Sequence, residues 1–290
     1  MATRAALCWR HVAVFAAALL AAAAVVVAGD PGKIGICHGR VGSNLPPPAT
    51  AAALLRQNGI TKARLFLPDP AVLPAFAASG IDLMVGVPNE NLTFLSAAGP
   101  DGALRWLQSA VLAHAPADRF YAPHLVPAMH NLHAALVSLG LGDKVKVSSA
   151  HASSVLAASY PPSAGAFDAA SLDVLRPMLR FLADTGAPFM VNTYPFISYV
   201  NDPVNVQLGY ALFGEGAPAV SDGALVYTNM FDATVDALAA ALDREGFGAV
   251  PIAVFLFDLY DEDGKPGAEF ERHFGIFRAD GSKAYNINFA

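Results

Sequence analysis

The stretch IAVFLFDLYDEDGK, from Ile252 to Lys265, begins in the last of six apolar runs that decide the fold and ends in a cluster of acids with one lysine. These runs show no alternation of apolar and polar residues, which is typical of parallel strands that are covered on both faces. The predicted strands are Lys33–Cys37, Ala63–Leu67, Ile81–Val87, Val145–Ser149, Phe189–Tyr194 and Val250–Asp258. Helical patterns separate them, over Thr50–Asn58, Gly102–Ala113, Val126–Leu139, Ser171–Thr185 and Phe231–Glu245.

The alternation of strands and helices predicts a parallel α/β fold. No glycine-rich phosphate fingerprint follows the first strand, so the size favours a (β/α)8 TIM barrel over a doubly wound sheet. A barrel needs eight strands, and six can be counted. Little room for a strand remains between Asp118 and Val126, and one run stands where two are expected between Glu245 and Phe274. We therefore expect an incomplete barrel, truncated at its fourth strand and in its seventh-to-eighth strand region.

Residues 1–28 have the pattern of a secretory signal peptide. Arg4 and Arg10 form a basic region, Val12–Val27 is apolar, and Val26 and Ala28 are small residues suited to cleavage after Ala28. The alternative is an uncleaved membrane anchor, for which the apolar run is short. We expect residues 29–290 to form a single domain that is freely secreted as a monomer.

The net charge limits the kinds of partner that the chain can bind, and the cysteine content limits its thiol chemistry. The formal net charge is −6, and removal of the two arginines makes it −8, which disfavours nucleic acid or an anionic membrane as a partner. Cys37 is then the one cysteine left; it is either a reactive thiol or, as the apolar KIGIC around it favours, a buried inert one. The triplet NLT at Asn91 is an N-glycosylation sequon.

Several segments carry a resemblance to a known family. They are KIGICHGRVGSNLP, KARLFLPDP, DLMVGVPNE, SYPPSAGAF, FMVNTYPF, GYALF, YTNMFDATVDAL and AEFERHFGIF. Their sequences and their order resemble plant glycoside hydrolase family 17, the endo-1,3-β-glucanases. The resemblance implies a (β/α)8 barrel, a 1,3-β-glucan substrate, cleavage with retention of configuration and no cofactor.

The same resemblance implies two catalytic glutamates that this chain lacks. In the family the acid/base lies in a Gly-Asn-Glu motif ending the fourth strand, and the nucleophile lies in Ser-Glu-Ser-Gly-Trp-Pro ending the seventh. Neither motif occurs here, so no catalytic residue can be assigned. The stretch from Ile252 resembles the start of the seventh strand joined to the end of the eighth.

The resemblance does assign supporting residues that would bind substrate. They are His38, where the family has an aromatic residue, and Asn192, Tyr194, Glu262, Lys265 and Glu271. The surviving acids near Glu262 and Glu271 either converge as a carboxyl pair or form a solvated loop, which we favour. A metal site is not expected there, because DEDGKPGAE does not fit a calcium loop.

Three functional hypotheses remain open. The chain is a 1,3-β-glucan hydrolase of this family with weak or no activity, or a non-catalytic β-glucan-binding protein, or the product of a truncated transcript or gene model.

Overall fold

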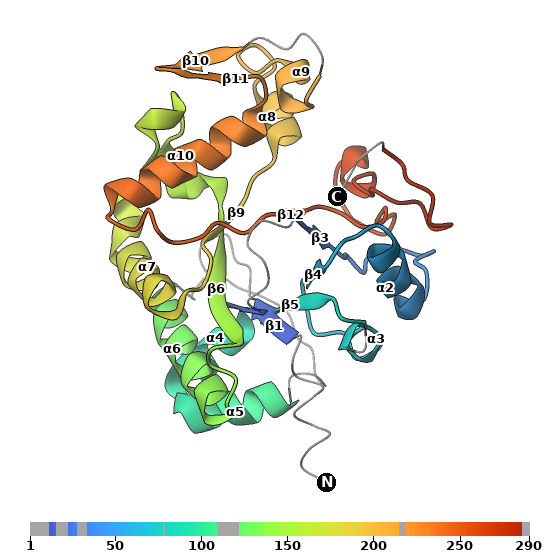
Figure 1. Cartoon of the computed structure of the whole chain (residues 1–290), viewed down its shortest axis with the longest axis vertical. Helices are drawn as coiled ribbons and strands as arrows, with labels where there is room; N and C mark the ends of the chain where they lie inside the picture. The colour runs from blue at the N-terminus through green and yellow to red at the C-terminus, as the bar shows by residue number, and fades with distance from the viewer. Residues whose placement is uncertain are drawn as a thin grey trace.

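The computed structural model describes residues 12–15, 23–27, 34–77, 79–109, 122–214 and 219–285. The described strands form an eight-stranded sheet, and helices lie around it (Figure 1). The strand order is β12-β3-β4-β5-β1-β2-β6-β9. Seven of the helices are α2 (Pro48–Gln57), α4 (Glu90–Ala97), α5 (Gly99–Ser109), α6 (Ala122–Ser138), α7 (Leu172–Thr185), α8 (Pro195–Asn201) and α10 (Met230–Arg244).

The first half of the sheet is regular. Strands β3 (Gly35–Cys37), β4 (Lys62–Leu65) and β5 (Asp82–Gly86) pair in parallel, and α2 and the short α3 (Leu73–Ala77) connect them. Side chains of these strands are mostly fully buried, which is why their sequences read as continuous apolar runs. The predicted strands and the helix over Thr50–Asn58 are confirmed, with shifted ends.

The second half begins at β6 (Val145–Ala152), which pairs in parallel with β9 (Met190–Asn192). Helices α6, α7 and α10 lie along this half (Figure 1). Helix α7 ends where Gly186 adopts φ 66°, a left-handed conformation that favours glycine at a helix end. Two small antiparallel pairs decorate the half: β7 (Leu156–Ala158) with β8 (Ala166–Phe167), and β10 (Val220–Asp222) with β11 (Leu225–Tyr227).

One extended segment closes the ring where two strands were expected. Ile252 bridges Phe189, next to β9, whereas β12 (Phe255–Leu256) pairs in parallel with β3. The Phe189 amide donates to the Pro251 carbonyl at 2.8 Å, and the Gly35 amide donates to the Val254 carbonyl at 3.0 Å. The segment thus changes partners along its length, as a join between a seventh and an eighth strand must.

The place of the fourth barrel strand is taken by the N-terminal segment. Strand β1 (Val12–Phe15) pairs in parallel with β5, and β2 (Ala23–Val27) pairs antiparallel with β5 and β6. Cleavage after Ala28, which remains a prediction, would remove both strands and leave facing edges of β5 and β6 unpaired. The predicted gap between Asp118 and Val126 is described from Ala122 onward, where α6 begins.

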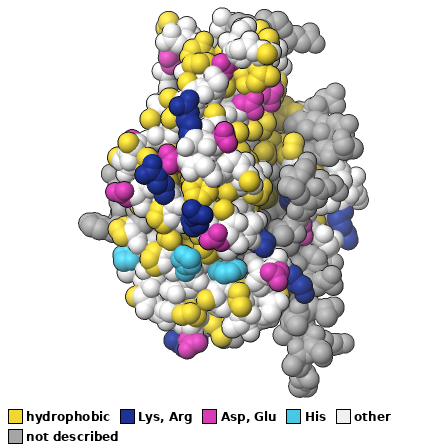
Figure 2. Space-filling model, turned by 60° about the vertical axis from the view of Figure 1, so that its left-hand side comes forward, with side chains coloured by type: hydrophobic (Ala, Val, Ile, Leu, Met, Phe, Trp, Pro, Cys, Tyr) yellow, Lys and Arg dark blue, Asp and Glu magenta, His cyan; other side chains and the backbone are white. Residues whose placement is uncertain are grey.

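The surface of the described residues carries mixed charge. Figure 2 shows basic and acidic side chains interspersed with apolar ones on the face that it displays. Among the described helices, none is long and apolar enough to cross a membrane. The remaining short elements are α9 (Leu208–Ala211) and the 3-10 turns Ser153–Val155, Pro162–Ala164, Ala169–Ser171 and Glu269–Arg272.

Candidate functional site

Three carboxylates after β12 hold the loop that follows β3. The amide of Gly39 donates to both oxygens of Asp258 at 3.0 Å, that of Val41 to Glu262 at 2.9 Å, and that of Ser43 to Asp263 at 2.6 Å. Alternate amides of one loop therefore meet three of the four acids of the other. We call this arrangement the carboxylate–amide corner, consisting of residues 39–43 and 258–263.

The innermost acid of this corner is held in an unfavourable setting for charge. Asp258 is 1% exposed and Glu262 3%. Burial, and then the negative charge of Glu262, raise the pKa of Asp258 well above its usual value, against the opposing effect of the donated amides. Glu262 is balanced by Lys265, whose Nζ lies 2.5 Å from its Oε2. The same Nζ lies 3.9 Å from the centre of the Phe257 ring.

Asn192 and Tyr194 lie at the end of β9, as the sequence predicted. Arg64, from β4, donates to the Asn192 side-chain oxygen at 3.3 Å. Tyr194 is half exposed, and burial of the rest of its ring raises the pKa of its phenol. Among the nearby groups, Arg64 lowers that pKa, whereas Cys37 and Glu271 raise it.

A row of phenylalanines runs from the end of β4, past β12, to the residues that follow β9. Phe66 meets Phe257 edge-on at 5.9 Å, Phe257 meets Phe274 at 5.8 Å, Phe274 meets Phe270 at 6.1 Å, and Phe270 meets Phe196 at 5.4 Å. We call these five residues the aromatic row. Phe66 is 37% exposed and the others are half-buried. The Arg64 guanidinium lies 4.6 Å from the centre of the Phe66 ring.

The aromatic row was missed at the sequence level. Its members follow β4, β9 and β12 or lie in the C-terminal turns, so they are far apart along the chain and only the closed sheet brings them together. The one available signal was that Phe66 and Phe257 lie near the ends of predicted strands and that Phe196 comes just after one. Polar and aromatic groups at the carboxyl ends of barrel strands occupy the position where this fold binds ligands.

His38 is enclosed by protein in this structure, and its expected role in sugar contact stays a prediction. The side chain is 0% exposed and packs between Phe76, stacked at 5.9 Å, and Tyr260, edge-on at 5.9 Å. Burial lowers the pKa of His38 to about 3. Neighbouring strand residues point to opposite faces, so Cys37 faces inward and His38 outward. Cys37 is buried as predicted, and burial raises the pKa of its thiol to about 12.

Two predicted residues remain, Asn91 and Glu271. Asn91 is partly exposed in the first turn of α4, and its glycosylation stays a prediction. Glu271 lies in the Glu269–Arg272 turn, partly buried. Among the described residues, no three His, Cys, Asp or Glu side chains are grouped so that they could hold a metal ion.

The fold and the site define a (β/α)8 barrel protein with acidic, basic and aromatic groups gathered at the carboxyl ends of its strands. The sequence profile described as "Glycosyl hydrolases family 17" matches residues 34–254 and 247–289. The chain belongs to this family. The two matched ranges overlap at residues 247–254, the segment that changes partners between β9 and β3.

Individual relatives agree with this assignment. A "Glucan endo-1,3-beta-glucosidase, acidic isoform" of Zea mays is 36% identical over 329 positions, covering 95% of this chain and 97% of that protein. A "Glucan endo-1,3-beta-glucosidase" of Vitis vinifera is 34% identical over 317 positions, covering 89% and 92%. Both alignments are longer than the present chain, so the relatives carry segments that it lacks.

A solved structure shows the same fold. "CJP38, a beta-1,3-glucanase and allergen of Cryptomeria japonica pollen" superposes with a TM-score of 0.80 at 32% identity. The superposition covers 89% of this chain and 99% of that one.

Proposed function

We propose that this chain binds 1,3-β-glucan along the aromatic row and hydrolyses it weakly or not at all. The observation that carries the proposal is the row itself, flanked by Arg64 and Lys265. Half-exposed aromatic rings offer apolar faces to sugar C–H groups, and the adjacent charged and amide groups can bond sugar hydroxyls. We take 1,3-β-glucan as the ligand because the similar proteins are named as glucan endo-1,3-beta-glucosidases.

The acids that remain are poorly placed for hydrolysis. Retaining cleavage needs two carboxyls about 5–5.5 Å apart, one as acid/base and one as nucleophile. The chain has no glutamate between Glu90 and Glu215, and no acidic residue of either kind from position 246 to 257. Asp258 and Glu262 are occupied by amides and by Lys265. These carboxyls therefore support the loops.

Binding is tested on the row with a matched exposed phenylalanine as control. Phe66→Ala should weaken binding of a linear 1,3-β-glucan, measured by isothermal titration, about tenfold. Phe94→Ala, at a 49% exposed phenylalanine on α4, should bind like the wild type. Equal affinity of the two variants, or no binding by the wild type, would contradict the proposal.

Hydrolysis is tested separately by release of reducing ends from the same glucan. We expect no release above that of a heat-denatured sample. Turnover that is abolished by Glu271→Gln would favour the second candidate, an active glucosidase in which the surviving acids have taken over the chemistry. Glu271 is the residue to change because its charge reaches Tyr194 in the site.

We also propose that the mature protein is extracellular and begins after Ala28. The basic and apolar pattern of residues 1–28 supports this, as does the sequon at Asn91. Amino-terminal sequencing of the protein from the medium of expressing plant cells tests the cleavage, and a mass shift on treatment with an N-glycosidase tests Asn91. Retention of Val12–Val27 in the secreted chain would contradict the first point.

A further inference from the structure

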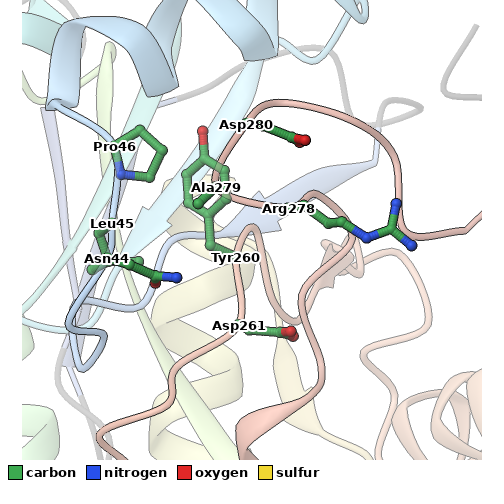
Figure 3. Close-up of a pocket in the computed structure, with 8 residues that line it drawn as sticks. All are labelled: Asn44, Leu45, Pro46, Tyr260, Asp261, Arg278, Ala279 and Asp280. Carbon is green, nitrogen blue, oxygen red and sulfur yellow. The ribbon is translucent and has the colours of Figure 1, made fainter.

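A recess lies beside the corner and apart from the aromatic row. Its volume is about 390 Å³, within the range of small-molecule sites. Three segments line it: Asn44–Pro46 after β3, Tyr260 and Asp261 after β12, and the turn Arg278–Asp280 (Figure 3). None of the five phenylalanines of the row is among its lining residues.

The Tyr260 hydroxyl is the unexplained group in this recess. The side chain is 3% exposed, and its hydroxyl has no hydrogen-bond partner among the described residues. Figure 3 shows the ring standing between Pro46 on one side and the Ala279–Asp280 turn on the other. Burial raises the pKa of Tyr260 to about 12, so the phenol keeps its proton and can both donate and accept. A buried polar group without a partner costs free energy unless something bonds it.

The tyrosine on β11 provides the contrast. Tyr227 is similarly buried, at 6% exposed, and its hydroxyl donates to Asp236 at 2.7 Å. Two adjacent acids serve the two sites. Glu262 bonds the Val41 amide and Lys265 in the corner, whereas Asp261 lines the recess. Tyr260 is therefore a buried hydroxyl in a built recess that the protein itself leaves unused.

The lining selects a class of ligand. Asp261 and Asp280 supply acceptor oxygens, Arg278 supplies donors, Asn44 supplies both, and Leu45 and Pro46 form an apolar wall. Two carboxylates against one guanidinium disfavour an anion, and the charged rim disfavours a purely apolar guest. A neutral ring that bears hydroxyls on its rim and C–H groups on its faces meets all of these surfaces.

We propose that this recess binds a single pyranose ring, with the Tyr260 hydroxyl bonded to a sugar hydroxyl. The ring is either a free monosaccharide or one glucosyl unit of a longer glucan. The inference stands apart from the proposed function, because the two sites share no lining residue.

The test removes the hydroxyl alone. Tyr260→Phe loses no hydrogen bond within the protein, so its urea midpoint should be no lower than that of the wild type. Methyl β-D-glucopyranoside and a linear 1,3-β-glucan are titrated by ligand-observed NMR. We expect Tyr260→Phe to weaken binding of the monosaccharide about fivefold, and Tyr227→Phe to bind as the wild type does.

The outcomes separate the two sites and the two sources of the ring. Phe66→Ala should weaken the long glucan and leave the monosaccharide unchanged. If Tyr260→Phe weakens both sugars, the recess also accepts a unit of the glucan; if it weakens only the monosaccharide, the ligand is the free sugar. Absence of saturable monosaccharide binding, equal binding by the two tyrosine variants, or loss of monosaccharide binding in Phe66→Ala would overturn the inference.

Discussion

The carboxylate–amide corner and the segment Pro251–Phe257 are continuous in sequence and differ sharply in how they are held. In the corner, three acids meet three amides and Asp258–Tyr260 are buried. In the segment just before it, every residue is half-buried, and the sheet bonds are divided between β9 and β3. The corner is therefore held by side-chain hydrogen bonds, whereas the segment before it is a single strand that is shared between β9 and β3.

This difference explains why we propose that the chain binds glucan but hydrolyses it weakly or not at all. The corner, Arg64 and the aromatic row depend on β3, β4, β9 and the end of β12, all of which remain. In the family the catalytic glutamates end the fourth and seventh strands, which are the positions that this chain has lost. On the proposed function, the residues that bind sugar would therefore remain without the groups that attack the glycosidic bond.

The largest effect is expected where the sparse segment joins β9. Phe189 is 0% exposed, stacks on His151 at 5.6 Å and meets Phe167 edge-on at 5.6 Å. Phe189→Ala should lower the free energy of unfolding by about 3–5 kcal/mol, because a large cavity opens where few neighbours can collapse into it. Urea denaturation measures this. A loss no larger than that of the exposed Phe94→Ala would show that the join is not structurally important.

A smaller loss is expected in the corner from breaking its ion pair. Lys265→Met leaves the carboxylate of Glu262, which is 3% exposed, without a cation. We expect a loss of roughly 2–4 kcal/mol at pH 7, because an uncompensated buried charge is costly. Restoration by Glu262→Gln in the double variant would be the matched control. A single variant as stable as the wild type would mean that the amide bonds alone hold the corner.

The sequence predicted the strands that remain complete and misjudged those that are shared. The runs at Lys33–Cys37, Ala63–Leu67 and Ile81–Val87 correspond to β3, β4 and β5 because each has a strand on both sides and a helix above. The run Val250–Asp258 is just as apolar, yet only two of its residues form β12. Its apolar character reflects two former strand positions, and local composition does not encode which neighbour each residue pairs with.

The candidate site was predicted in part for the same reason. Asn192, Tyr194, Glu262 and Lys265 were assigned because short motifs that resemble the family carry them, and their binding role stays a prediction. Phe66 and Phe270 are ordinary residues until the sheet closes and brings their rings into one row. His38 was assigned from its place beside Cys37, and sequence position alone did not indicate that its side chain would be fully buried.

The next prediction concerns the pH dependence of stability, to which one buried histidine near each region contributes. Burial lowers the pKa of His38, beside the corner, to about 3, and that of His151, at the end of β6, to about 4. The unfolded chain takes up protons below about pH 6.5 while the folded chain does not, so stability is present above that pH and falls as the pH falls. Removing one such group should reduce the slope by about 1.4 kcal/mol per pH unit between pH 6 and 4.5.

His151→Phe is the variant that measures this. Urea unfolding at pH 7 and at pH 5 should show a smaller difference for the variant than for the wild type. The buried Asp258 acts in the opposite direction, because its raised pKa makes the folded state bind a proton more tightly, a contribution lost as the pH rises. An unchanged slope in His151→Phe would mean that His151 is protonated in the folded protein.

The smallest effect should come from an ion pair far from both regions. Arg176 on α7 meets Glu245, at the end of α10, with Nε 2.7 Å from Oε2, and its side chain is 60% exposed. Water screens such a pair, and ordering two long side chains offsets the attraction. Arg176→Met should therefore shift the urea midpoint slightly at low salt and not at all in 1 M NaCl, where the Debye length is about 3 Å. The Lys265→Met loss should persist in the same salt, because its partner carboxylate is shielded from the ions. If both losses vanished together, the corner would be as open to solvent as the helix surface, and the contrast between the two regions would fail.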